Sequence, residues 1–425
     1  MTISKIKIAN IRVIIIFLAL YAFYLIGFFL NEDSSGGAIA DYSAYEPIIK
    51  SFALDFKYSF FNFDDFGERH SPVLIMLLSI FYKLNIDATI IRFVNLNISI
   101  ISIFLFYKCL SFKFKNVENN YLILISAIFF LSPIFRSLNI WPDSRIYGFH
   151  FFILSTFFYL KFIYYEKKNY FCYLNIVFLA IASYFSPNFS LFSIFFLYQF
   201  YKHFKLSIEI LNCIILNLVL ALPAFYYLFI LDIFFLANVG VNPTSDVVNK
   251  FGIPIEYNIS NKILIISSII FFYFIPIMII KKNLFIYENK INSKNFFLLL
   301  VLFILPLMIT FNYSLNITGG GIVLHLSNFL FKNNLLFYII SLFSVLVVFN
   351  LCKHNLNNFI IIMILFFSNP QLSIYHKYYD PLIFFLTFTL LSVRLNKSFF
   401  NYRNILIMYI FYIIFLILNL LKQFF

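Results

Sequence analysis

Charge is scarce in this 425-residue chain, and acidic charge is the scarcer kind. Charged residues make up 12% of the sequence, against about a quarter in an ordinary soluble domain. Only 18 residues are acidic, whereas 31 are basic. Hydrophobic residues make up 62%, and the mean hydropathy is +0.91. This composition excludes a water-soluble globular protein. The apolar runs are continuous and do not alternate with polar residues, which favours helical membrane spans over the strands of a β-barrel.

Cysteine is also rare, and its placement excludes two further classes. The four cysteines, Cys109, Cys172, Cys213 and Cys352, lie far apart in or near apolar runs. No pair has the spacing of a redox motif or a zinc site, so we interpret them as small buried side chains. The net charge of +13 does not indicate nucleic-acid binding, because the basic residues are scattered through short loops.

The fold class that follows is an all-α, polytopic membrane protein with about thirteen spans in a single domain, 1–425. The N-terminus is expected in the cytoplasm, and the carboxylate-rich face is expected on the periplasmic or outer side. The expected spans are 13–30, 91–109, 121–137, 147–165, 171–186, 188–202, 207–231, 262–280, 296–313, 333–352, 356–369, 379–394 and 404–421.

The distribution of charge supports this topology. Every segment expected inside is basic, as the positive-inside rule requires. Of the acidic residues, only Glu118, Glu166, Glu209 and Glu288 fall inside. The apolar segment 71–86 is too short for a comfortable span, and counting it as one would place the lysine clusters outside. We therefore expect an interfacial or re-entrant helix there.

The first outer loop, 31–90, is the most acidic part of the chain and the expected place of chemistry. We expect it to contain two short interfacial helices, near 41–53 and 72–84. Two glycines precede Asp41, which is expected at or near a helix start, and Glu46 follows one turn later. Asp41 is either a simple helix N-cap or a general base at the membrane surface.

Other outer segments carry further candidates. His70 precedes Ser71 and Pro72 at the start of the second short helix, where it is expected to orient a phosphate or a carboxylate, or to reach the interface. In the second outer loop Asp143 either assists Asp41 or pairs with Arg145. The acids Asp64, Asp65 and Glu68 suit a solvated turn. Their spacing matches no strong metal motif, although hard cations bind such oxygens.

Two late segments complete the set. Gly319, Gly320 and Gly321 form either a flexible bend or a backbone phosphate site. The segment 375–381 (YHKYYDP) contains His376, Lys377 and Tyr378. Cations and tyrosines together suit an anionic lipid headgroup, or an aromatic belt at the membrane interface.

These residues resemble the GT-C superfamily of integral-membrane glycosyltransferases, which use polyprenyl-phosphate sugars. Four features carry the resemblance: the acidic first loop with Asp41, the His-Ser-Pro helix start at 70–72, Asp143 before a span, and the Lys-Tyr-Tyr-Asp-Pro element at 377–381. The resemblance extends over most of the chain in the order of its spans and loops, but the motifs that carry it are short. The adjacent Asp-Glu pair of many members is Asp41-Tyr42 here, and no large periplasmic domain follows the spans.

The resemblance implies a bacterial inner-membrane transferase that moves a sugar from a polyprenyl-phosphate donor to a glycan or lipid acceptor. Asp41 is the implied base and Asp143 a second catalytic carboxylate. Arg145, His376 and Lys377 are implied phosphate ligands, and Glu46, His70 and Tyr378 are further substrate-binding candidates. A divalent cofactor has no support in the sequence. Three alternatives stay open: a surface-glycan polymerase or ligase, a transporter or flippase for a lipid-linked substrate, and a non-catalytic assembly factor.

Overall fold

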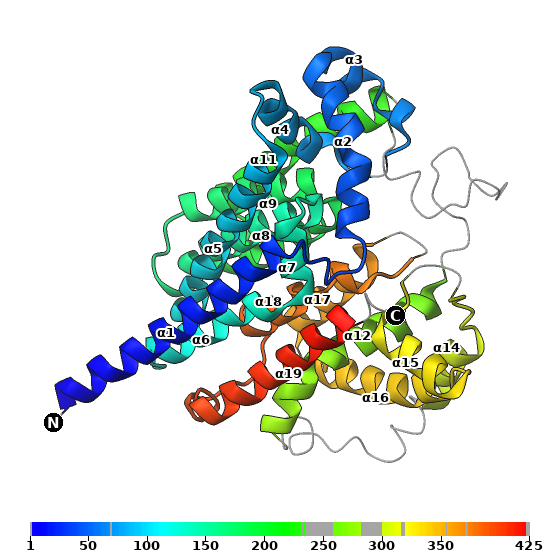
Figure 1. Ribbon diagram of the computed structural model, residues 1–425. Coiled ribbons are helices and arrows are strands. Elements are labelled where there is room, and N and C mark those ends of the chain that lie inside the picture. Colours follow the sequence, from blue (N-terminus) through cyan, green and yellow to red (C-terminus); the bar gives the residue numbers. More distant parts are fainter. Residues whose placement is uncertain are drawn as a thin grey trace. The chain divides into compact units, whose positions relative to one another are not determined.

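The computed structural model describes residues 2–68, 70–231, 233, 258–281, 300–315, 319–353, 355–369 and 373–421, and the side chains of residues 2–10, 300 and 301 are not considered. Every regular element within these residues is a helix (Figure 1). The chain forms two compact units, which we describe separately: residues 1–235 with 396–425, and residues 236–395. The expected single membrane domain stays a prediction.

The first unit contains the longer series of helices. Its elements are α1 (Thr2–Phe29), α2 (Ala38–Leu54), α3 (Phe56–Phe61), η1 (Phe63–Phe66), α4 (Pro72–Lys83), α5 (Ala88–Lys113), α6 (Asn119–Ala127), η2 (Ile128–Leu131), α7 (Pro133–Ile140), α8 (Ser144–Tyr164), α9 (Tyr170–Phe185), η3 (Pro187–Phe189), α10 (Phe192–Phe204), α11 (Ile208–Phe225), η4 (Tyr226–Ile230), η7 (Lys397–Phe399) and α19 (Tyr402–Leu421). The second unit contains α12 (Ile259–Ile280), η5 (Leu300–Ile304), α14 (Leu305–Ile309), α15 (Gly321–Phe331), α16 (Leu335–Cys352), α17 (Leu356–Phe367), η6 (His376–Tyr378) and α18 (Leu382–Phe388).

Seven helices in the described part of the chain are long and apolar enough to cross a membrane, which identifies a polytopic helical membrane protein. They are Ile11–Phe29, Ala88–Lys113, Ser144–Tyr164, Ile208–Ile230, Ile259–Ile280, Leu335–Cys352 and Tyr402–Leu421. An eighth would be Asn119–Leu131 with Pro133–Ile140, which are bent by 64° at their junction. The bend has a simple cause, because Pro133 cannot continue the hydrogen-bond ladder of the preceding helix.

The expected count of thirteen spans is therefore not confirmed. At four other expected positions the structure has helices that are too short: α9 with 16 residues, α10 with 13, α17 with 12 and α18 with 7. At about 1.5 Å per residue, none of them alone covers a hydrocarbon core of about 30 Å. The expected span 296–313 begins in residues outside the described ranges.

The two short helices expected in the first loop lie at α2 and α4, with α3 and η1 between them. In Figure 1 the helices α2, α3 and α4 lie together at one end of the first unit, and α2 packs on α4. Ser71 caps α4 and its hydroxyl also donates to the carbonyl of Tyr184 at the end of α9. Helix α4 has 12 residues, which is too short for a span, as expected for segment 71–86.

Helix α8 is held in place by a buried polar contact and by a glycine. His150 on α8 contacts Ser102 of α5 through Nδ1 at 2.7 Å and Asn139 of α7 through Nε2 at 2.8 Å. Two residues before His150, Gly148 lets α8 approach its neighbour, since a Cβ there would lie 2.7 Å from the Cβ of Ser186. The start of α8, which carries two candidate site residues, is thus fixed against three other elements.

The consecutive glycines Gly319, Gly320 and Gly321 lie at a backbone contact within the second unit. All three have positive φ angles, of 104°, 94° and 75°, a region that favours glycine. The N–H of Gly320 donates to the carbonyl of Ile374 at 2.9 Å, and a Cβ on Gly319 would lie 2.7 Å from that oxygen. The bend is therefore required by close packing against the segment before His376.

Candidate functional site

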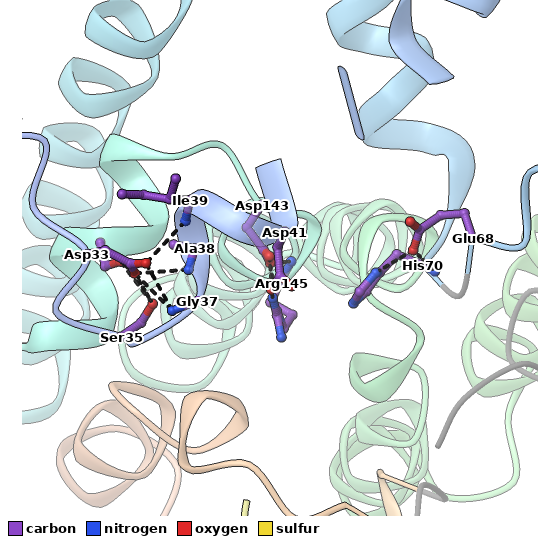
Figure 2. Close-up of polar contacts among 11 residues, drawn as sticks. Asp33, Ser35, Gly37, Ala38, Ile39, Asp41, Glu68, His70, Asp143 and Arg145 are labelled. Carbon is purple, nitrogen blue, oxygen red and sulfur yellow. Dashed lines mark hydrogen bonds and ion pairs between the residues drawn. The ribbon is translucent and has the colours of Figure 1, made fainter. Parts of the chain in front are cut away.

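Helix α2 is anchored at its start by Asp33. The Asp33 carboxylate accepts hydrogen bonds from the N–H groups of Gly37 (3.0 Å), Ala38 (2.9 Å) and Ile39 (3.3 Å), as Figure 2 shows. The N–H of Asp41 donates to the carbonyl of Gly37 at 2.9 Å and so belongs to the first turn of the helix itself. The N-cap interpretation of Asp41 is therefore wrong, because Gly37 is the N-cap residue.

That side chain meets a guanidinium group from α8. Asp41 Oδ2 lies 2.6 Å from Nη2 of Arg145, and the same nitrogen contacts Oδ2 of Asp143. Arg145 Nε also donates to Asp143 Oδ1 at 2.7 Å. The two candidate carboxylates thus share one cation (Figure 2). We call Asp41, Asp143 and Arg145 the carboxylate cluster.

The three members of the carboxylate cluster differ in exposure. Asp143 and Arg145 are buried, whereas 17% of the Asp41 side chain is exposed. Asp143 also caps α8, because its Oδ1 accepts the N–H of Arg145 at 2.8 Å. Burial alone would raise the pKa of Asp143, but the adjacent guanidinium of Arg145 outweighs burial and lowers it. With both acids ionised the cluster carries one net negative charge, and Asp41 is its accessible member.

A histidine–carboxylate contact lies beside the cluster. Nδ1 of His70 is 2.7 Å from Oε1 of Glu68, and both side chains are nearly buried. The His70 ring meets the ring of Tyr45 edge to face, with centroids 5.7 Å apart. Tyr45 lies one helical turn after Asp41, and the charges of Asp143, Arg145, Glu68 and Asp41 all act on its hydroxyl group. His70 is therefore a neighbour of the cluster, with its ring oriented by Glu68.

Glu46, the other candidate on α2, lies elsewhere. Glu46 lies five positions after Asp41, which places the two side chains on different faces of a helix. Glu46 pairs with Lys50 at 2.7 Å, and both side chains are about half exposed. The structure does not bring Glu46 to the carboxylate cluster.

The three candidates His376, Lys377 and Tyr378 form η6 in the second unit. Nε2 of His376 lies 2.7 Å from the hydroxyl oxygen of Tyr273 on α12, and its ring meets that of Phe272 edge to face. The amine of Lys377 lies 5.0 Å from the ring centroid of Tyr375. These contacts fix the three residues within their own unit.

Sequence reasoning missed a second arginine site in the first unit, which we call the closed pair: Glu32 and Arg136. Arg136 Nε donates to Glu32 Oε1 at 2.8 Å, and Arg136 Nη1 donates to the carbonyl of Phe130 at 2.9 Å. Arg136 is 1% exposed. Gly27 leaves the necessary room, because a Cβ there would lie 2.3 Å from Glu32 Oε2. The available signal was an arginine at the end of an apolar run.

The fold and these contacts define a polytopic helical membrane protein with a carboxylate cluster at the start of an apolar helix. Within the described ranges no group of three His, Cys, Asp or Glu side chains is arranged to hold a metal ion. No family model matches the chain, and no curated protein and no solved structure shows significant similarity to it.

Proposed function

We propose that the protein is a membrane glycosyltransferase of the GT-C type, which transfers a sugar from a polyprenyl phosphate to a hydroxyl group of a glycan or lipid. One observation carries the proposal: Asp41 is a partly exposed carboxylate held at 2.6 Å by Arg145, whose other partner is the buried Asp143. Two acids that share one cation beside an apolar helix are expensive to maintain in a membrane protein and are expected to be functional.

The chemistry follows from the donor. The acceptor oxygen forms a bond to the anomeric carbon while the bond from that carbon to the phosphate oxygen breaks, and the phosphate leaves with the bonding electrons. The acceptor hydroxyl becomes acidic as its oxygen bonds to carbon, so a carboxylate is a sufficient base. Asp41 takes that proton. No general acid is needed, because a phosphate ester is already a good leaving group.

In this mechanism Arg145 and Asp143 position the carboxylate of Asp41. The guanidinium orients the Asp41 carboxylate, and Asp143 orients the guanidinium through two contacts. Because two carboxylates already surround Arg145, it is a weaker anion ligand than a free arginine. The resemblance still predicts phosphate binding by Lys377, a cation that would stabilise developing charge, and by His376. Burial lowers the pKa of His376 to about 3, so it would act as a neutral hydrogen-bond partner.

The finer topology belongs to the same proposal. It comprises a cytoplasmic N-terminus and a site on the periplasmic side of a bacterial inner membrane. The basic inside segments support this orientation, and the short α4 supports an interfacial first loop.

The test uses membranes that contain the full chain and a panel of polyprenyl phosphates, each carrying a labelled sugar. Wild type is expected to transfer label to an endogenous glycan or lipid, and Asp41→Asn to lose about 10²- to 10⁴-fold of that rate, as for removal of a general base. Asp65→Asn is the matched control, because Asp65 is an exposed acid of the same loop. Full transfer by Asp41→Asn at equal protein level rejects the assigned base. Translocation of the labelled lipid without sugar transfer would favour the flippase alternative.

A further inference from the structure

Several buried polar atoms of the first unit have no hydrogen-bond partner among the described residues, and the hydroxyl group of Tyr45 is the one that the charges of the carboxylate cluster act on together with Glu68. Tyr45 is 1% exposed, and among the described residues its oxygen has no hydrogen-bond partner. A buried hydroxyl without a partner destabilises a fold, whereas phenylalanine would fill nearly the same space without this penalty. The tyrosine is therefore explained if a molecule other than the chain itself binds its hydroxyl.

The position of Tyr45 shows where the bound group of that molecule would lie. Tyr45 follows Asp41 by four residues on α2, which places both side chains on one face of the helix. Its ring contacts His70, and the carboxylate cluster lies within electrostatic range of its hydroxyl. A group bound to Tyr45 is consequently a group beside the carboxylate of Asp41.

The surroundings of Tyr45 favour a hydroxyl group. Among the described residues three carboxylates, Asp41, Asp143 and Glu68, act on the Tyr45 hydroxyl, which is itself a hydrogen-bond donor. An uncharged hydroxyl group would accept a hydrogen bond from Tyr45 and donate one to Asp41.

We propose that the Tyr45 hydroxyl binds the acceptor hydroxyl group of a neutral, polyhydroxylated substrate and orients it toward Asp41. The proposal rests on the glycosyltransferase function proposed above and assigns the acceptor subsite within it. Tyr45 donates its proton to the acceptor oxygen in the ground state, and the acceptor's own proton passes to Asp41 as the new bond forms.

The experiment separates the acceptor from the donor by using water as a competing acceptor. Purified protein receives the labelled polyprenyl phosphate that wild type uses, together with glycerol, methyl glucoside or methyl galactoside. Hydrolysis of the donor and transfer to each alcohol are measured in the same reaction. We expect Tyr45→Phe to lower the ratio of transfer to hydrolysis about five- to tenfold, as for loss of one hydrogen bond, and to leave hydrolysis within about twofold of wild type.

Two variants make the outcomes distinct. Asp41→Asn is expected to lose both reactions, and Tyr58→Phe is the matched control, because Tyr58 is an exposed tyrosine of the same loop. An unchanged ratio in Tyr45→Phe, an equal fall in both reactions, or hydrolysis by wild type without transfer to any of the alcohols overturns the acceptor subsite. The transferase proposal survives all three results. Absence of both reactions in wild type with every donor overturns the two proposals together.

A stability measurement excludes a purely structural role. Trp141 is the one tryptophan of the chain and lies near α2, with its ring centroid 5.8 Å from that of Tyr42. Its fluorescence therefore reports unfolding of this region. Without acceptor present, Tyr45→Phe is expected to unfold at the same temperature as wild type or above it. A clear decrease would show that the hydroxyl stabilises the fold, and would overturn the proposal.

Discussion

The first unit contains two arginine sites whose construction differs. Arg136 and Arg145 lie nine positions apart, on α7 and at the start of α8, and each contacts an acid of the segment that follows α1. In the closed pair one carboxylate meets one guanidinium, and the remaining donors of Arg136 reach the carbonyls of Phe130 and Phe23. In the carboxylate cluster two acids share one guanidinium and part of Asp41 is exposed.

The difference between the two sites indicates a structural role for the closed pair and a catalytic role for the carboxylate cluster. A buried pair with balanced charge can hold two segments together, but it presents no accessible carboxylate to a substrate. A cluster with one surplus carboxylate keeps an ionised group that can accept a proton. The comparison therefore predicts that changes in the closed pair lower stability, whereas changes in the carboxylate cluster lower activity.

The largest expected effect on stability comes from Arg136→Met. It leaves Glu32 buried without its cation, and breaking a buried pair in this way destabilises proteins by about 3–5 kcal/mol. The Trp141 indole N–H donates to the carbonyl of Glu32 at 3.1 Å, so the thermal unfolding of detergent-solubilised protein can be followed by tryptophan fluorescence. The double variant with Glu32→Gln should recover part of the loss. Wild-type stability in the single variant would show that the closed pair is dispensable.

Gly27→Ala tests the closed pair without removing either charge. The new Cβ would lie 2.3 Å from Glu32 Oε2 and 2.6 Å from Arg136 Nη2, so both side chains must move. Overpacking of this kind costs about 1–3 kcal/mol. The same fluorescence measurement applies, and in the Arg136→Met background the further loss should be smaller. Equal losses in the two backgrounds would mean that the alanine disturbs something other than the ion pair.

The class of fold could be predicted from the sequence, because long apolar runs have few other structures open to them. The number of membrane spans could not be predicted from the sequence. Hydropathy counts apolar residues, whereas Pro133 and Pro187 end or bend helices within apolar segments. The shortness of α4 was predictable, because its run is short and the basic loops would otherwise face outward.

The candidate site was predictable only in part. Asp41 and Asp143 stand out because acids are rare, and the pairing of Asp143 with Arg145 is local. The contact of Asp41 with Arg145 joins residues 104 positions apart, which no spacing rule reaches. Tyr45 is one of 30 tyrosines, so only burial and its bonding state distinguish it. The role of Asp33 could not be predicted, because a turn with two glycines separates this residue from the helix start that its carboxylate caps.

Asp33→Ala connects the two sites, because Asp33 lies directly after Glu32 and fixes the helix that carries Asp41. Loss of a helix cap costs about 1–2 kcal/mol, and here it also releases the first turn of α2, so sugar transfer should fall with it. Asp55→Ala is the matched control, because Asp55 caps α3 through the N–H of Tyr58 at 2.9 Å. Both variants should lose stability, but only Asp33→Ala should lose transfer. Equal transfer rates in the two variants would mean that the position of Asp41 does not depend on this cap.

The smallest expected effect is the pH dependence of Asp143. Arg145 lowers its pKa below the usual 3.8, so ionised Asp143 stabilises the fold above that pH, and this contribution is lost as the pH falls through the lower folded value. Asn at this position does not titrate. The difference in unfolding temperature between wild type and Asp143→Asn should therefore be constant from pH 8 to about pH 5 and shrink toward pH 3. A difference that already shrinks between pH 8 and pH 6 would show that Arg145 does not lower the pKa of Asp143 in the folded protein.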